Sequence, residues 1–309
     1  MRILVTGTTG FVGRHIVAAL VTDGHEVHGL VRSAASASSL ARGGVRLHEG
    51  DMRAPDSYRH LIPEVDAVIH AAQLATSGRV TAARARSVFD ADQIMTTALA
   101  DGCLQHGRRL VYTGGCFDWG DRGEDWIDES TPLSPSPMGV GHARMAAMLS
   151  KLHQERGLDV VRLNPVFVYG PGGLLASAFV DQASKGRLRC IGSGQNWWSC
   201  IHVADLGRAY AAAVVRAAPG SNYAVADDQP IRLRELTDLV TDAMARPRVG
   251  NGAPWLVGLF IGRPLVASLV TSFRVDASRI RRELGWQPEQ PSVRTALPGI
   301  VHELASTPA

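Results

Sequence analysis

The sequence predicts an α/β protein with a doubly wound parallel sheet and a smaller C-terminal lobe. Two observations predict this fold class. Short apolar runs alternate with helix-length segments through the first half of the 309-residue chain, which is typical of repeated strand–helix–strand units. After Gly170 this alternation gives way to shorter elements that are separated by glycine and proline, which indicates a second lobe.

Six apolar runs are expected to be the buried strands of the sheet. The segments between them have helical periodicity, so helices should cover both faces, the longest over residues 80–105. Residues 1–172 are predicted to form the first domain, with residues 203–226 returning to it, and residues 173–309 mainly form the second lobe. The expected strands are residues 3–6, 27–31, 45–48, 67–70, 110–113 and 160–163.

Composition excludes several classes of protein. The net charge is only +3 and no basic run contains interleaved aromatic residues, so nucleic-acid binding is not expected. The four cysteines have neither metal-ligand nor redox spacing, so we expect no metal site and reduced thiols in a cytoplasmic protein. Arg263 and Pro264 interrupt the apolar stretch 253–273, leaving pieces too short to cross a bilayer. We expect two helices there, in the core or lining a pocket.

The strongest chemical signal is the segment T-G-T-T-G-F-V-G at residues 6–13, between the first strand and the first helix. Gly7 permits a tight turn, Gly10 lets the backbone approach a pyrophosphate, and Gly13 lets the helix pack against the strand. The helix N-terminus attracts the phosphate charge. The segment therefore predicts a dinucleotide site in a Rossmann-type domain. The residues expected to contact the cofactor here are Gly7, Thr9, Gly10, Phe11 and Val12.

The end of the second strand favours NADP(H) over NAD. Val31 stands where an NAD site of this kind places a carboxylate for the ribose hydroxyls, and Arg32 follows it. Valine accepts no hydrogen bond from a hydroxyl, whereas a guanidinium pairs with a 2′-phosphate. We expect Arg32 and Ser33 to hold that phosphate. The alternative is that Arg32 is an ordinary solvated arginine.

The chain resembles the extended short-chain dehydrogenase/reductases of the NAD-dependent epimerase/dehydratase type. After the glycine turn, residues 50–52 (G-D-M), 70–73 (H-A-A-Q) and 162–171 (R-L-N-P-V-F-V-Y-G-P) match family segments in the family's order. Residues 201–206 and 284–288 match its C-terminal landmarks, in which His202 and Asp205 are expected to be structural. The resemblance implies further cofactor contacts from Asp51, Met52, Ala71, Ala72, Gln73, Thr113, His142, Pro165 and Val166.

The departure from the family concerns its catalytic residues. The family uses a serine after the fifth strand and a Tyr-x-x-x-Lys pair, in which the tyrosine transfers the proton and the lysine lowers its pKa and binds the nicotinamide ribose. In this chain Gly115, Met138 and His142 occupy the serine, tyrosine and lysine positions. No tyrosine in the sequence is followed by a lysine four residues later. The resemblance thus implies a reductase without the usual triad.

Several groups are candidates for the missing proton donor. Thr113, Ser134 or Ser136 can hydrogen-bond a developing oxyanion, and His142 can act directly, through water, or only by binding the ribose. An acidic hydroxyl on the substrate itself is a further donor, because a phenol beside the ketone is far more acidic than serine. Met138 adds flexible apolar surface for a flat ligand.

The residues and the resemblance together predict an NADPH-dependent ketoreductase of a bulky hydrophobic ketone, similar to the triad-less ketoreductases of aromatic polyketide antibiotic biosynthesis. The expected partner is this small molecule, with no nucleic acid and no membrane, and the chain is a monomer or homodimer. Two alternatives remain: a non-catalytic NADP(H)-binding sensor or scaffold, and a sugar-nucleotide enzyme that uses Arg187, Arg189 and Arg274. The expected substrate contacts are Met138, Trp119, Asn164 and Trp198.

Overall fold

The computed structural model describes residues 1–74 and 78–306 and contains a seven-stranded parallel sheet. Its strand order is β12-β7-β5-β4-β1-β2-β3, so the order reverses between β1 and β4. This architecture confirms the predicted fold class, and all six expected strands are present. The strands are β1 (Arg2–Thr6), β2 (Glu26–Val31), β3 (Arg46–Glu49), β4 (Ala67–His70), β5 (Arg109–Thr113), β7 (Val160–Pro165) and β12 (Asn222–Val225).

Helices cover both faces of this sheet. On one face α1 (Phe11–Thr22) and α6 (Val203–Arg216) join the larger core cluster, and on the other α3 (Ala82–His106) and α4 (Val140–Arg156) join a second cluster. The Thr81 hydroxyl caps α3 by accepting a hydrogen bond from Arg84 N at 3.2 Å, and Gly107 ends the helix in the left-handed region. The long predicted helix is thus confirmed. A short helix, α2 (Ser38–Arg42), links β2 and β3.

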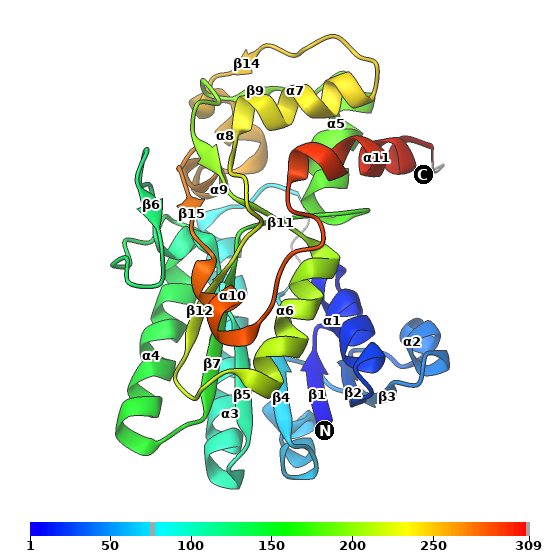
Figure 1. Ribbon diagram of the computed structural model, residues 1–309, viewed down its shortest axis with the longest axis vertical. Coiled ribbons are helices and arrows are strands. Elements are labelled where there is room, and N and C mark those ends of the chain that lie inside the picture. The colour runs from blue at the N-terminus through cyan, green and yellow to red at the C-terminus, as the bar shows by residue number, and fades with distance from the viewer. Residues whose placement is uncertain (75–77, 307–309) are drawn as a thin grey trace.

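The remaining elements lie mostly beyond the carboxyl ends of the sheet strands, at the top of Figure 1. Parallel sheets bind their ligands at this end. The paired strands are β6 (Trp126–Ile127) with β15 (Arg274–Val275), β8 (Phe167–Tyr169) with β11 (Cys200–His202), β9 (Cys190–Ile191) with β14 (Asn251–Gly252), and β10 (Trp197–Trp198) with β13 (Ile231–Arg232). The helices are α5 (Asp181–Ser184), α7 (Leu233–Ala243), α8 (Pro254–Ile261), α9 (Arg263–Leu269), α10 (Ser278–Leu284) and α11 (Val293–Ser306).

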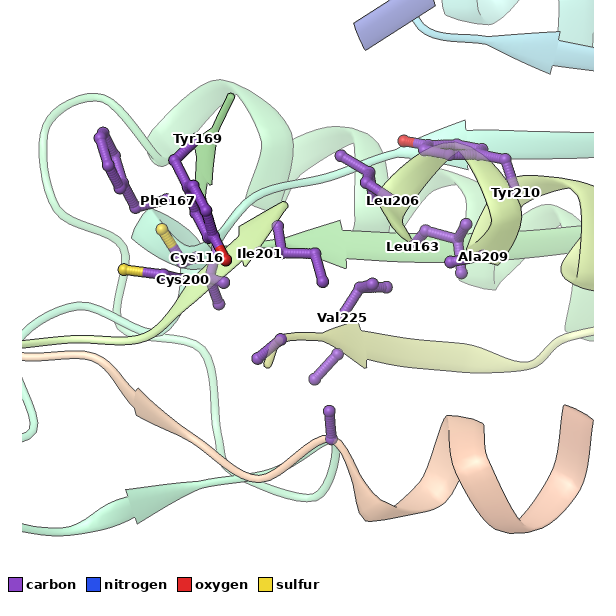
Figure 2. Packing of buried hydrophobic residues seen from close by; sticks show 14 of the residues in the cluster. Cys116, Leu163, Phe167, Tyr169, Cys200, Ile201, Leu206, Ala209, Tyr210 and Val225 are labelled. Atoms are coloured by element: carbon purple, nitrogen blue, oxygen red, sulfur yellow. The ribbon is translucent and has the colours of Figure 1, made fainter. Parts of the chain in front are cut away.

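The core continues from the sheet into the pair β8–β11. Figure 2 shows Phe167 and Tyr169 of β8 near Cys200 and Ile201 of β11, with Cys116 beside them. All four cysteines are free and buried, as expected for reduced thiols. Burial raises the pKa of the Cys116 and Cys200 thiols, so neither is a reactive thiolate at neutral pH.

The apolar stretch 253–273 forms the two predicted helices, α8 and α9, which meet at Gly262, next to Arg263 and Pro264. A location in the core is wrong for α8. Trp255 and Phe260 expose 70% and 72% of their surface, because α8 turns its smaller side, with the buried Gly258, toward the protein. Within residues 1–74 and 78–306, no helix has both the length and the apolar content to span a membrane.

Candidate active site

The turn between β1 and α1 has the geometry of a phosphate cradle. Gly7 has φ 76°, and a Cβ on Gly13 would lie 2.0 Å from the Gly7 carbonyl oxygen, so the helix packs against the turn only because residue 13 is glycine. Gly10 is the N-cap of α1 and no side chain caps it. The first N–H groups of α1 therefore remain free of side-chain acceptors and fit a pyrophosphate.

Other residues of this turn differ in their surroundings. Thr9 is exposed beside Gly10, whereas Val12 packs against the main core cluster. The Phe11 ring lies against the glycine segment after β8, because a Cβ on Gly173 would be 2.7 Å from it. Phe11 therefore helps to join the turn to the segment that follows β8.

The end of β2 presents the residues expected at the adenosine ribose. Val31 is buried, Arg32 is exposed, and the Arg32 guanidinium has no hydrogen-bond or ion-pair partner within residues 1–74 and 78–306. After Ser33 the chain is held by Glu49, whose carboxylate accepts a hydrogen bond from Ala34 N at 2.8 Å. A free cation next to this turn is suited to an anionic group.

The segments after β3 and β4 lie next to this turn in the strand order. Asp51 is exposed, and its carboxylate accepts a hydrogen bond from Arg53 N at 2.7 Å, while Met52 packs partly against the second core cluster. After β4, Ala72 N donates to the Thr6 hydroxyl at 3.1 Å. Ala71 and Ala72 are half-buried and Gln73 is exposed.

The three residues expected at the family's triad positions lie after the end of β5 and at the start of α4. A Cβ on Gly115 would meet no atom of residues 1–74 and 78–306 within 4 Å apart from its chain neighbours, so the described part of the chain leaves space at the expected serine position. Met138 and His142 line the same cavity, of about 580 Å³, and Gln73 lines it as well. The rest of its wall comes from α3, the start of α4 and α9: Ala82, Ala85, Arg86, Val88, Phe89, Asp92, Pro137, Val140, Gly141, Arg144 and Pro264.

His142 contacts buried polar groups at the cavity wall. Its Nδ1 lies 3.3 Å from the Tyr112 hydroxyl, which donates a hydrogen bond to Asp92 Oδ2 at 3.0 Å. Burial lowers the pKa of His142, although the charge of Asp92 and the Thr113 carbonyl act in the opposite direction. Tyr112 itself is no acid at neutral pH, because burial and Asp92 raise its pKa well above the usual value.

The structure separates the other candidate proton donors from the cavity. The Thr113 hydroxyl lies 2.7 Å from the His70 carbonyl oxygen and 2.6 Å from the Tyr210 hydroxyl, so it already has partners. Ser134 is exposed, and Ser136 is buried, with its hydroxyl 2.9 Å from that of Ser268. None of these three serine and threonine candidates lines the cavity.

Three of the four expected substrate contacts lie in the core instead. Trp119 and Trp198 expose 1% and 3% of their surface, and Trp198 packs on Phe273 with ring centroids 5.6 Å apart. The buried Asn164 amide donates to Asn222 Oδ1 on the neighbouring strand. The structure corrects these three expectations, because the large rings fill the interior between the sheet and the second lobe. Only Met138 lines the cavity.

The remaining residues expected to contact the cofactor are Pro165, which ends β7, and Val166, which follows it. Pro165 pairs with Val225 of β12, and the buried Val166 donates its backbone N–H to the Val225 carbonyl oxygen at 3.4 Å. Their backbone is therefore fixed at the carboxyl end of the sheet.

Sequence reasoning missed Asp92 and Tyr112. A signal for Asp92 is present in the sequence, because it shares one face of α3 with the buried Met95, Thr96 and Leu99, where an acid needs a partner. No cluster of three or more metal-binding side chains occurs among the residues that the structure describes.

Comparison with known proteins agrees with this geometry. The model of the "NAD dependent epimerase/dehydratase family" matches residues 3–226. The chain belongs to this family. Its fold is close to that of the dTDP-glucose 4,6-dehydratase from Streptomyces venezuelae solved with NAD and TYD bound. The TM-score is 0.83 at 25% identity, over 98% of this chain and 96% of that one.

Two curated relatives of this family member are reductases. The 2-alkyl-3-oxoalkanoate reductase of Stenotrophomonas maltophilia is 28% identical, over 85% of this chain and 81% of the relative. The 4-hydroxy-2-methyl-3-oxo-4-farnesyl-3,4-dihydroquinoline-1-oxide ketoreductase of Stigmatella aurantiaca is 28% identical, over 91% of this chain and 85% of the relative. Family and relatives together support an oxidoreductase that uses a nicotinamide cofactor, and they confirm the family resemblance read from the sequence.

Proposed function

We propose that the chain is an NADPH-dependent ketoreductase of a bulky hydrophobic ketone, with an aromatic polyketide as the preferred class. The observation that carries the proposal is the cavity beside His142, in which Met138 replaces the family tyrosine among Val88, Phe89 and Val140. Most of the wall is apolar and it also contains Gln73, Arg86, Asp92, His142 and Arg144, which suits a hydrophobic ligand that has polar substituents. The two reductase relatives are named for ketones with alkyl and farnesyl groups, which supports the same class.

The sugar-nucleotide alternative requires cations for a diphosphate. Arg187, Arg189 and Arg274 were the candidates, and none of them lines the cavity. The Arg274 guanidinium lies over the Trp126 ring at 4.3 Å, so it already has a partner. The cavity arginines are Arg86 and Arg144, which in this proposal face an acidic hydroxyl of the ketone.

When bound, the nicotinamide supplies the hydride for the ketone carbon. The residues of this chain bind the cofactor and orient it against the ketone. The glycine turn and the N-terminus of α1 hold the diphosphate, Arg32 and Ser33 hold the 2′-phosphate, and His142 bonds the nicotinamide ribose. Orientation of the two reactants supplies much of the rate acceleration.

The proton for the product alkoxide is proposed to come from the substrate. The candidate side chains support this, because Thr113 has other partners, Ser134 is exposed, and Tyr112 has a strongly raised pKa. A phenol next to the ketone is acidic enough to donate. The reduction then needs no side chain in the tyrosine position, and Met138 serves to contact the substrate.

A panel of paired aromatic ketones, with and without an adjacent phenol, tests the proposal through NADPH oxidation. We expect turnover only, or at least tenfold faster, with the phenols, and no gain from Met138→Tyr alone because the lysine partner is still missing. NADPH binding without oxidation of any ketone would favour the non-catalytic sensor. A large gain from Met138→Tyr would contradict the proton route.

The NADPH preference is tested by Arg32→Ala. Loss of a charge-assisted hydrogen bond of about 1.5–3 kcal/mol should weaken NADPH binding about tenfold or more and leave NADH binding unchanged. Arg42→Ala, an exposed arginine in α2, is the matched control. An unchanged ratio of the two dissociation constants in Arg32→Ala would overturn the NADP assignment.

A further inference from the structure

Four polar side chains from four different elements meet at the cavity wall, which Asp92 and His142 line. His70 comes from β4, Asp92 from α3, Tyr112 from β5 and His142 from α4. Asp92 is the centre of the group, because its Oδ2 accepts a hydrogen bond from Tyr112 and its Oδ1 lies 3.3 Å from His70 Nε2. The Thr96 hydroxyl donates to Oδ1 at 3.4 Å.

Burial makes this arrangement unusual. His70 and Tyr112 each expose 1% of their surface and Asp92 exposes 8%. Their polar atoms therefore depend on hydrogen bonds within the protein and not on water. Burial raises the pKa of Asp92, but His70, the charge of His142 and the Tyr112 hydroxyl outweigh it and lower the pKa overall. Asp92 is therefore a buried carboxylate, which is stable only with partners.

Proton counting assigns the direction of the hydrogen bonds. Tyr112 has one hydroxyl proton, and it is donated to the Asp92 carboxylate, which has none to give. The contact of 3.3 Å between the Tyr112 oxygen and His142 Nδ1 is then a hydrogen bond only if Nδ1 carries a proton. Asp92 therefore favours, through Tyr112, a His142 ring that carries a proton on Nδ1, and the Thr113 carbonyl also favours a protonated ring.

The same group reaches the turn after β4. His70 Nδ1 lies 2.8 Å from the Thr6 hydroxyl, which accepts a hydrogen bond from Ala72 N. On its other side His70 faces Asp92, with Nε2 3.3 Å from Oδ1. One buried network therefore supports both His142 and the turn expected over the cofactor.

We propose that Asp92 and Tyr112 are positioning residues that fix the ring and the protonated nitrogen of His142, so that this histidine takes over the ribose-binding role of the missing lysine. The inference rests on the proposed function for the role of His142 at the ribose. It adds that the role of His142 depends on the buried carboxylate of Asp92 on α3. A lysine at this position would not need that carboxylate, because each proton of its ammonium group can be donated.

The test is a double-mutant cycle on the NADPH dissociation constant, measured by direct binding without a ketone. Tyr112→Phe keeps the ring and removes the link between Asp92 and His142. We expect NADPH binding to weaken about five- to tenfold in Tyr112→Phe and in Asp92→Asn, and no further weakening when either is combined with His142→Ala. Tyr223→Phe is the control, since the hydroxyl of this buried tyrosine bonds Glu283 Oε2 on α10 and Tyr223 does not line the cavity.

A second arm separates positioning from general damage. In His142→Lys the lysine supplies its own charge, so Tyr112→Phe should no longer change NADPH binding. In the wild-type background Tyr112→Phe should raise KM for NADPH and leave kcat at saturating NADPH within about twofold, while urea unfolding checks that the variant is folded. Additive losses in the cycle, or an unchanged dissociation constant in folded Tyr112→Phe, would overturn the inference.

Failure of the two proposals can be told apart. If no ketone is reduced but the losses of NADPH affinity are non-additive as expected, the proposed function is wrong and the role of Asp92 at His142 stands. If a ketone is reduced but the losses of NADPH affinity are additive or absent, the proposed function stands and the positioning role is wrong. The pH dependence of NADPH binding reflects every titratable or charged group near His142. These groups are Asp92, Tyr112 and His70, and the cavity residues Arg86 and Arg144.

Discussion

At the residue scale, Asp118 is a buried acid outside the cavity. It ends the short 3-10 turn Cys116–Asp118 after β5 and exposes 2% of its surface, and its Oδ1 has no hydrogen-bond partner among residues 1–74 and 78–306. Burial raises its pKa to about 8, even though the Gly115 backbone and the charge of Arg162 act to lower it. The folded protein therefore keeps a proton on Asp118 at a pH where the unfolded chain has lost it.

Asp118→Asn should stabilise the protein, and more so at higher pH. Between about pH 4 and pH 8 the folded state binds the extra proton, so the wild-type free energy of unfolding falls as pH rises through this window. The variant lacks this loss and should gain about 1–3 kcal/mol at pH 8 and little near pH 4. Urea unfolding at several pH values measures the difference.

The exposed Asp125→Asn in the same segment serves as the control and should show no such trend. An equal gain for Asp118→Asn at pH 5 and pH 8 would mean that the carboxyl group is already ionised in the folded protein. The sequence offered no sign of this site, because the strand-to-loop position of Asp118 looks like any polar loop position until the neighbouring elements cover it.

At the scale of elements, α8 behaves differently from its composition. A two-turn helix of apolar residues is normally buried, and the sequence analysis placed it so. In the structure only one side of α8 is covered, whereas the rings of Trp198 and Phe273 fill the interior nearby. The apolar residues of α8 have no periodicity that favours one face, so the packing of the neighbouring elements determined which side of α8 is buried.

We expect Trp255→Ser and Phe260→Ser each to change the free energy of unfolding by less than about 0.5 kcal/mol, since both side chains are largely exposed. Trp198→Ala should cost about 3–5 kcal/mol, because it leaves a cavity in the core. Denaturant midpoints compare the three variants. A cost above about 2 kcal/mol for Trp255→Ser would show that α8 is buried in solution.

At the scale of the whole molecule, Asp205 ties the last segment of the chain to α6. Its carboxylate accepts hydrogen bonds from Glu289 N and Gln290 N, both at 3.0 Å, and its carbonyl oxygen accepts one from Trp286 Nε1 at 3.1 Å. Asp205 is fully buried and also pairs with Arg208. The family landmarks around residues 201–206 and 284–288 thus meet in space.

Asp205→Ala should destabilise the whole molecule by about 2–4 kcal/mol, since two buried N–H groups lose their acceptor. NADPH affinity of the folded fraction should stay unchanged, because Asp205 does not line the cavity. His202→Ala is the comparison, since the half-buried His202 has an unpartnered Nδ1 and should cost less. A loss of NADPH affinity in a stable Asp205→Ala protein would contradict a purely structural role.

The sequence by itself determined the sheet strands, the long helix and the glycine turn. These depend on local rules, because buried parallel strands need apolar runs and a turn at φ 76° needs glycine. The absence of the family triad remains a prediction from the resemblance. Only the tertiary structure decided which aromatic rings are buried, where α8 lies, and that Asp92 and Tyr112 meet His142. Those outcomes depend on side chains 20 to 50 positions apart, such as Asp92, Tyr112 and His142, which no local pattern brings together.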